Sequence, residues 1–211
     1  MTICLVLCHN VIVPLRNGCA YRIEVHMFSV EKSAQMAAYL LHKRGGQMSF
    51  LKLMKLLYLS DRKSLELYGE PISGDRYVSM NYGPVLSNVY SLIADGSEPG
   101  NKWEKWIRDG ADHTVVLRQQ FDDIYELTEL SRADVRTMDD VYEQYGHWNR
   151  FDLCDETHRI CPEWQDPHGS SIPIRVEDIF KALGRSAEES EALARDLMTK
   201  NQLELLTSDL R

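Results

Sequence analysis

The stretch SFLKLMKLLYLSDRKSLELYG, residues 49–69, decides the fold. Its apolar side chains recur three and four residues apart and form one stripe, because such positions share a face of a helix. Ser49 is a favourable N-cap residue, and Gly69 is a favourable residue for ending a helix. The stretch therefore predicts an amphipathic helix over about 50–68. Its apolar face is expected to contain Phe50, Leu53, Met54, Leu57 and Tyr58.

Further helices are predicted on both sides of this stretch. Upstream, Ser29 is the expected N-cap of a helix that carries an apolar stripe and ends at Gly45-Gly46. Downstream, Pro84 suits the first turn of a helix that ends at Asp95-Gly96. Caps, stripes and stop residues predict later helices that begin near Ser131, Arg150, Val176 and Ser186.

Short extended segments complete the expected fold. Residues 77–80 suggest a short strand, and the runs Trp103–Ile107 and Thr114–Leu117 predict a β-hairpin joined through Asp109-Gly110. The proline- and glycine-containing stretch 162–173 predicts an irregular segment. The fold class is therefore expected to be mainly α, a single helical domain with a small β-hairpin or strand element.

The chain is expected to divide into three parts. Residues 1–26 are rich in β-prone runs and hold three of the five cysteines, whereas Met27 directly precedes the first clear helix. Residues 1–26 therefore form either a small strand appendage or an extension upstream of the native start at Met27, and the second interpretation is favoured. Residues 27–185 form the main domain, and residues 186–211 form a C-terminal helix.

Composition excludes several classes of protein. With 44% hydrophobic and 27% charged residues in 211, the chain is neither disordered nor fibrous. Its longest apolar runs, Ile3–Cys8 and Met36–Leu41, are far shorter than the ~18 residues that cross a bilayer, so no membrane association is expected. The odd number of cysteines favours reduced thiols, and no Lys or Arg precedes Arg16, so a secretory signal is not indicated. We expect a cytoplasmic protein.

The formal net charge is −8. Domains that bind duplex nucleic acid are usually basic because they neutralise phosphates, so direct nucleic-acid binding is not expected. An acidic surface attracts a basic protein partner, but it also serves solubility alone. The net charge alone does not decide between a basic protein partner and a role in solubility.

Two groups of residues suggest enzyme chemistry. A zinc site is suggested by Cys154, His158, Cys161 and His168, although their spacing matches no common zinc module. Acid–base catalysis is suggested by Asp61, Glu66, Asp75 and His158. Each group also has a structural interpretation, because a chain with 32 carboxylates contains chance pairs. No cofactor and no metal is expected, and no nucleotide-binding glycine motif is present.

Aromatic residues near the turns suggest either an interface or loop packing. Tyrosine and tryptophan often anchor protein interfaces, and Tyr58, Tyr77, Tyr82 and Trp164 lie beside polar or helix-breaking residues. The same rings are equally suited to hold a loop onto the helices. Asp61-Arg62 and Asp75-Arg76 could form a salt-bridge latch on that loop, or belong to a solvated helix face.

Three ordered motifs resemble a known family. They are KLMKLLYLSDR at 52–62, continued by YGEPISGDRY at 68–77; MNYGPV at 80–85; and Thr157-His158 followed by Pro162-Glu163-Trp164. Together they resemble the Panacea domain, the SocA-like antitoxin family, over about residues 27–183. Residues 1–26 lie outside the resemblance.

The resemblance implies a mainly helical fold with a small strand element, and a function in a toxin–antitoxin pair. Members neutralise a toxin by binding it; the toxin is usually encoded by the adjacent gene, often on a mobile element or prophage. The family is not known for catalysis, and we find no candidate DNA-binding segment outside the domain. Two alternatives remain: an adaptor that delivers the toxin to a protease, or a hydrolase or zinc enzyme built on Asp61, Asp75 and His158.

The resemblance also indicates candidate site residues. Loop 69–84 and segment 158–164 are expected to form the binding surface, with Asp61, Asp75 and Tyr82 fixing the loop or touching the partner and His158 orienting a hydrogen-bond network. The candidates for toxin binding are Tyr58, Asp61, Arg62, Asp75, Tyr77, Tyr82, His158 and Trp164. The candidates for structural roles are Gly69, Pro71, Gly74, Gly83, Pro84 and Pro162.

Overall fold

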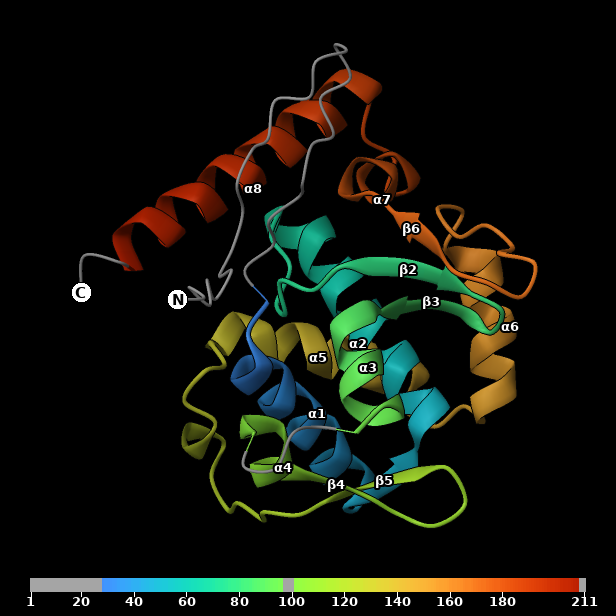
Figure 1. Ribbon diagram of the computed structural model, residues 1–211, viewed down its shortest axis with the longest axis vertical. Helices are drawn as coiled ribbons and strands as arrows, with labels where there is room; N and C mark the ends of the chain where they lie inside the picture. Colours follow the sequence, from blue (N-terminus) through green and yellow to red (C-terminus); the bar gives the residue numbers. More distant parts are fainter. Residues whose placement is uncertain (1–27, 97–100, 209–211) are drawn as a thin grey trace, which may run out of the picture.

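The computed structural model describes residues 28–96 and 101–208. The strands suggested for residues 1–26, and the native start expected at Met27, lie outside the described residues. In chain order the elements are α1 (Val30–Arg44), β1 (Gln47–Ser49), α2 (Phe50–Tyr68), β2 (Tyr77–Met80), β3 (Gly83–Leu86), α3 (Ser87–Ala94), α4 (Lys102–Trp106), β4 (Ile107–Asp109), β5 (Thr114–Leu117), the 3₁₀ turn η1 (Ile124–Glu126), α5 (Arg132–Tyr145), α6 (Arg150–Ile160), β6 (Ile172–Ile174), α7 (Val176–Ala182) and α8 (Ala187–Ser208). The fold is mainly α with two small sheets, as the sequence predicts (Figure 1).

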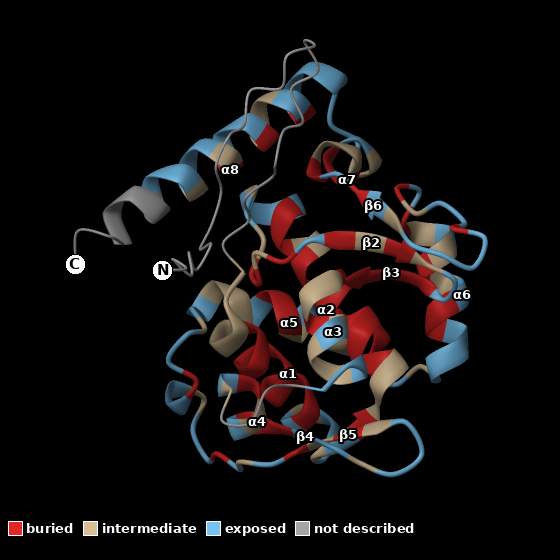
Figure 2. Ribbon diagram, in the orientation of Figure 1, coloured by how far each residue is buried: buried red, intermediate tan, exposed pale blue. Residues whose placement is uncertain are grey.

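Helix α2 is the centre of the fold. The predicted boundaries are confirmed, but every residue from Lys52 to Asp61 is buried, so the helix is covered on all sides along this length (Figure 2). It packs against α1, α5, α6, α3, α7 and β3. A helix surrounded in this way buries its polar positions too, and these must find partners in the interior.

The N- and C-terminal helices begin and end largely as predicted. Ser29 accepts a hydrogen bond from the Lys32 amide at 3.1 Å, and Gly45 ends α1 with a left-handed φ of 94°. Capping boxes at Ser131 and Ser186 open α5 and α8. Helix α6 is three residues longer than predicted. Helix α8 packs on α7 near its start, and further along it Lys200 pairs with Glu70, just after the end of α2, at 2.6 Å (Figure 1).

One sheet has the order β3-β2-β6, with both pairs antiparallel. The prediction that Pro84 opens a helix is wrong: Pro84 lies in strand β3 opposite Ser79, and the helix begins at Ser87. Gly83, with φ 99°, closes the turn that brings β3 back along β2. Because β3 is an edge strand, the missing amide of Pro84 is tolerated.

Strand β6 is a second difference, because the stretch 162–173 was expected to be irregular. Residues Ile172–Ile174 pair with Ser79–Tyr77 of β2. So short a segment, with Pro173 at its centre, has little strand signal of its own. It becomes a strand through pairing with β2.

The other sheet has the order β1-β5-β4. The predicted hairpin is confirmed for Ile107–Asp109 and Thr114–Leu117, but residues 103–106 form helix α4 instead of strand. The Asn101 side chain caps α4, and both Trp103 and Trp106 are buried. Along the described residues no helix is both long and apolar enough to cross a membrane.

Candidate functional site

Asp61 holds the loop that follows α2. Its carboxylate accepts hydrogen bonds from the Ile72 amide at 3.1 Å, the Ser73 amide at 2.9 Å, the Ser73 hydroxyl, and the Tyr77 hydroxyl at 3.2 Å. Burial raises the pKa of Asp61 to about 6, and the bonds from Ser73 act in the opposite direction. The partners of Asp61 are therefore neutral hydrogen-bond donors. The alternative considered from the sequence, a salt-bridge latch at Asp61, is not what holds the loop.

Asp75 caps helix α3 from a distance in sequence. It accepts hydrogen bonds from the amides of Asn88 and Val89, both at 2.9 Å, and from the Arg76 amide at 2.6 Å. The Asp75 carboxylate thereby satisfies free amide donors at the start of α3 and in the turn before β2. Burial raises the pKa of Asp75, and the three amide bonds oppose that shift. Asp61 and Asp75 thus fix the two ends of the loop.

Glu163 joins α2 to the segment after α6. The Tyr58 hydroxyl donates to Glu163 Oε1 at 2.7 Å, and Arg62 Nε donates to the same oxygen at 2.7 Å. Tyr58 also meets the Tyr77 ring edge-on, with centroids 5.8 Å apart. Burial raises the pKa of Tyr58 well above its ordinary value. Glu163 lies in the third motif, and no role was predicted for it from the sequence.

Two buried lysines of α2 were also missed. Lys55 Nζ donates to the Pro84 carbonyl at 2.9 Å, and Lys52 Nζ donates to the carbonyls of Trp148, at 2.7 Å, and Gly146. Burial lowers the pKa of each ammonium to about 8. Both lysines occur in the 52–62 motif. One signal could have identified them: each lies in a helix among apolar neighbours, where a lysine is unusual.

The turn between β2 and β3 is packed against α6. A Cβ on Gly83 would lie 2.6 Å from Thr157 Oγ1 and 3.4 Å from His158 Cδ2. The His158 ring stacks on Trp164 with centroids 4.0 Å apart, and Trp164 Nε1 donates to the Met80 carbonyl at 2.9 Å. Within the described residues His158 Nε2 is buried without a hydrogen-bond partner, and the ring contact is the stack on Trp164. Burial lowers the pKa of His158.

The candidates differ sharply in exposure. Tyr58, Asp61, Asp75 and Tyr77 are buried, Arg62 and Trp164 are half-buried, and Tyr82 is 61% exposed at the hairpin turn. The structure therefore gives the buried candidates contacts inside the protein and presents Tyr82 to solvent. The hairpin turn, residues 81–83, with its supports on α6 and in segment 161–169, is called the hairpin tip below.

Four of the candidates for structural roles lie in loops or at helix ends. Gly69 ends α2 with φ 72° and donates to the Leu65 carbonyl, while Gly74 has φ 65° in the following loop. Pro71 lies in the loop that Asp61 holds, and the exposed Pro162 follows the C-cap of α6.

The residues suggested for enzyme chemistry are not gathered into one site. His158 lies beside Trp164 and Lys55, whereas Asp61 and Asp75 face the loop and α3. Glu66 is on the surface, paired with Lys63 at 2.7 Å. Over residues 28–96 and 101–208 there is no group of three or more His, Cys, Asp or Glu side chains arranged to hold a metal ion.

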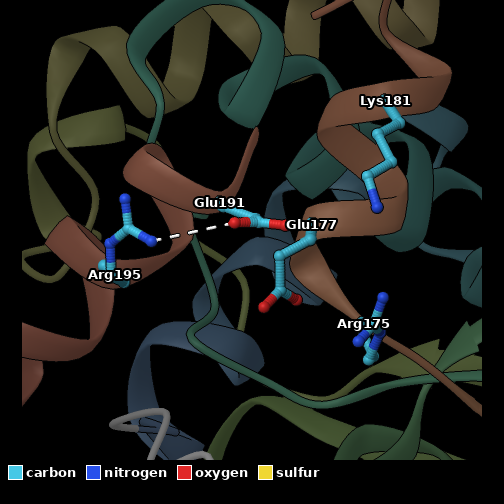
Figure 3. Close-up of a pocket in the computed structure, with 5 residues that line it drawn as sticks. All are labelled: Arg175, Glu177, Lys181, Glu191 and Arg195. Carbon is cyan, nitrogen blue, oxygen red and sulfur yellow. Dashed lines mark ion pairs between the residues drawn. The ribbon is translucent and has the colours of Figure 1, made fainter. Parts of the chain in front are cut away.

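A pocket between α7 and α8 lies apart from these motifs. Five charged side chains line it: Arg175, Glu177, Lys181, Glu191 and Arg195 (Figure 3). Arg195 pairs with Glu191, four residues earlier on α8, at 3.8 Å. None of the candidate residues lines this pocket, so it is not part of the hairpin tip.

Comparison with known proteins gives one match. The family model described as antitoxin SocA-like, Panacea domain, matches residues 53–165. No curated protein and no solved structure matches the chain. The matched range begins in α2 and ends after Trp164, so it contains all the candidates for toxin binding and for structural roles, together with the hairpin turn and the first part of segment 161–169. His168 lies outside the match. The matched range is narrower than the 27–183 indicated by the resemblance.

Proposed function

Because this chain belongs to the SocA-like antitoxin family with a Panacea domain, we propose that it neutralises a protein toxin by binding it directly through the hairpin tip. The family supports an antitoxin role, and with it a toxin partner. Our proposal adds to this that the chain neutralises the toxin by binding it directly and not by another route. Neutralisation by binding needs no catalytic residue, and the proposed role is not enzymatic.

The exposure of Tyr82 carries the proposal. A tyrosine that is 61% exposed at the end of a short turn is available to a partner, and tyrosine is enriched among residues that dominate interface energetics. The turn is supported from within the protein, by buried Lys55 on Pro84, by buried Thr157 against Gly83 and by half-buried Trp164 on Met80. A ring presented on a fixed support loses little conformational entropy on binding.

Several finer points follow the family resemblance. The toxin is proposed to be the product of the adjacent gene, on a mobile element or prophage, with both proteins acting in the cytoplasm. A net charge of −8 supports a protein partner over nucleic acid. We further propose that residues 27–185 form the toxin-binding body, 186–211 a C-terminal helix, and 1–26 an extension outside it.

Co-expression with the product of the adjacent gene tests the proposal. Growth rescue and a stable complex are expected for the wild-type chain, and Tyr82→Ala is expected to raise the Kd about 30-fold while leaving the melting temperature unchanged. Tyr125→Ala is the matched control, because Tyr125 is 68% exposed and lies on η1, outside the hairpin tip.

Three results would overturn the proposal. A harmless neighbour would remove the toxin partner. Growth rescue that disappears when a host protease is deleted would indicate the adaptor role instead. Equal binding by Tyr82→Ala and wild type would show that the toxin docks elsewhere.

A further inference from the structure

The hairpin tip is flanked by two exposed carboxylates. On one side Gly83 lies against His158 of α6, and Asp155 is three residues before His158, hence on the same face of that helix. At the same turn, the Asn81 side chain accepts a hydrogen bond from the Gly169 amide at 3.1 Å, and Asp166 belongs to the segment that contains Gly169. Both carboxylates act to raise the pKa of His158, as expected if both lie near it.

The negative charges of Asp155 and Asp166 are only weakly neutralised by cationic groups of the protein itself. Among the described residues Asp155 forms no ion pair. Asp166 accepts a hydrogen bond from the His168 amide at 2.8 Å and lies 3.7 Å from the His168 ring, which is charged only when protonated. The nearest cation of α6, Arg159, pairs with Glu156 at 2.6 Å, and Lys55 is buried against Pro84. The surface around Tyr82 is therefore both aromatic and acidic.

We infer that the hairpin tip receives a basic segment of the toxin, with an arginine guanidinium stacked on the Tyr82 ring and neighbouring basic side chains paired with Asp155 and Asp166. The inference rests on the proposed function and adds the chemistry of the partner. A guanidinium is planar, stacks on aromatic faces and makes forked hydrogen bonds to carboxylates, which a lysine ammonium does less well. In the hairpin tip and beside it, Tyr82 offers an exposed aromatic ring, and Asp155 and Asp166 offer exposed carboxylates.

The charge of the whole chain acts in the same direction. A net charge of −8 attracts a basic surface over distance and speeds its encounter with the tip, and salt weakens this attraction. Asp155 and Asp166 then provide the contacts at close range. Binding is therefore expected to depend on salt through these two residues in particular, beyond the effect of net charge alone.

The test compares variants that have the same net charge. Asp155→Asn/Asp166→Asn removes the flanking carboxylates, and Asp122→Asn/Asp196→Asn removes two other exposed carboxylates, one near η1 and one on α8. Tyr82→Leu keeps apolar bulk but loses the aromatic face, whereas Tyr82→Phe keeps that face. The probe is the purified product of the adjacent gene, and Kd is measured at about 0.05 M and 0.3 M salt.

We expect Asp155→Asn/Asp166→Asn to raise the Kd about tenfold at low salt and to flatten its salt dependence, while Asp122→Asn/Asp196→Asn stays within about twofold of wild type. Tyr82→Leu is expected to weaken binding, and Tyr82→Phe to bind like wild type. Matching melting temperatures would establish that all variants are folded.

Two outcomes separate the inference from the proposed function. If Tyr82→Leu weakens binding but the two asparagine double variants behave alike, the tip binds toxin without a basic segment and the inference is wrong. If the wild-type chain forms no complex, or no hairpin-tip variant affects it, the proposed function fails and the inference fails with it.

Discussion

The ammonium of Lys55, in the middle of the central helix, donates a hydrogen bond to the Pro84 carbonyl at 2.9 Å. The donor is buried in α2 and the acceptor lies in edge strand β3, directly after the hairpin turn. This contact links the position of the turn to the helix around which the whole fold is packed. Lys52 makes an equivalent link from α2 to the end of α5 through the Gly146 and Trp148 carbonyls.

The burial of Lys55 predicts a rise in stability at alkaline pH. The folded chain releases this proton near pH 8, whereas the unfolded chain keeps it up to the ordinary pKa of 10.5. From about pH 8 to 9 the unfolded state binds more protons at Lys55, so the free energy of unfolding increases with pH. Above about pH 9 the increase is opposed, because burial raises the pKa of the Cys161 thiol from 9.0 to about 12 and the folded chain keeps that proton. Above pH 10 the trend reverses, because burial raises the pKa of Tyr58 and Tyr77, which stay protonated in the folded state.

Urea denaturation between about pH 7.5 and 9.5 measures this slope. Lys55→Met should reduce the slope and leave the share that comes from Lys52, whose pKa is also lowered to about 8. Identical slopes for the variant and wild type would show that Lys55 does not titrate in this range.

Asp61→Ala is expected to lower the free energy of unfolding by about 3 kcal/mol or more. The substitution leaves the amides of Ile72 and Ser73 and the hydroxyl of Tyr77 without their acceptor in a buried site. The exposed Asp196→Ala should change stability by less than about 0.5 kcal/mol. Denaturant unfolding compares the two, and a loss as small as that of Asp196→Ala would contradict a central role for Asp61.

The Glu163 cluster predicts two losses of different size. Glu163→Ala leaves the Arg62 guanidinium and the Tyr58 hydroxyl without their acceptor, and the expected loss is about 3–5 kcal/mol. Tyr58→Phe removes one hydrogen bond but leaves the Arg62–Glu163 pair, so about 1 kcal/mol is expected. Thermal and urea unfolding of both variants measure this order, and the reverse order would show that Tyr58 is the more important member.

Gly83→Ala tests the close packing of the turn. The added methyl would lie 2.6 Å from Thr157 Oγ1, at a residue with φ 99°, so a loss above about 2 kcal/mol is expected. In the double variant with Thr157→Ala the contact with Oγ1 is removed, while the backbone strain and a 3.1 Å approach to Lys55 Nζ remain, so part of the loss should be recovered. Additive effects in this double-mutant cycle would mean that the two residues do not meet.

The helices that sequence predicted well carry their signals locally. Ser29, Ser131 and Ser186 cap helices within three residues of themselves, and Gly45 and Gly69 end helices at once. The start of α3 was mispredicted because its capping carboxylate, on Asp75, is 13 residues away from Asn88, one of its donors. Such a cap can be recognised only in the folded chain.

The sequence motifs predicted which residues belong to the candidate site better than they predicted what each residue does. The motifs contain Tyr58, Asp61 and Tyr82 alike, but only the fold determines that the first two are buried and the third is exposed. The role of Lys55 depends on the elements that surround α2, because a lysine within a helix normally lies at its surface. Glu163 likewise gains a role from partners about 100 residues earlier in the chain.

The pairing of β6 with β2 means that the matched family region does not coincide with a complete sheet. A chain cut after Gln165 would lose residues Ile172–Ile174 and leave the outer side of β2 with unpaired backbone amides and carbonyls. Such an open edge is a template for association with other chains. Anyone who shortens this protein or fuses it to another domain should therefore keep the chain through β6, or self-association could be mistaken for binding to a partner.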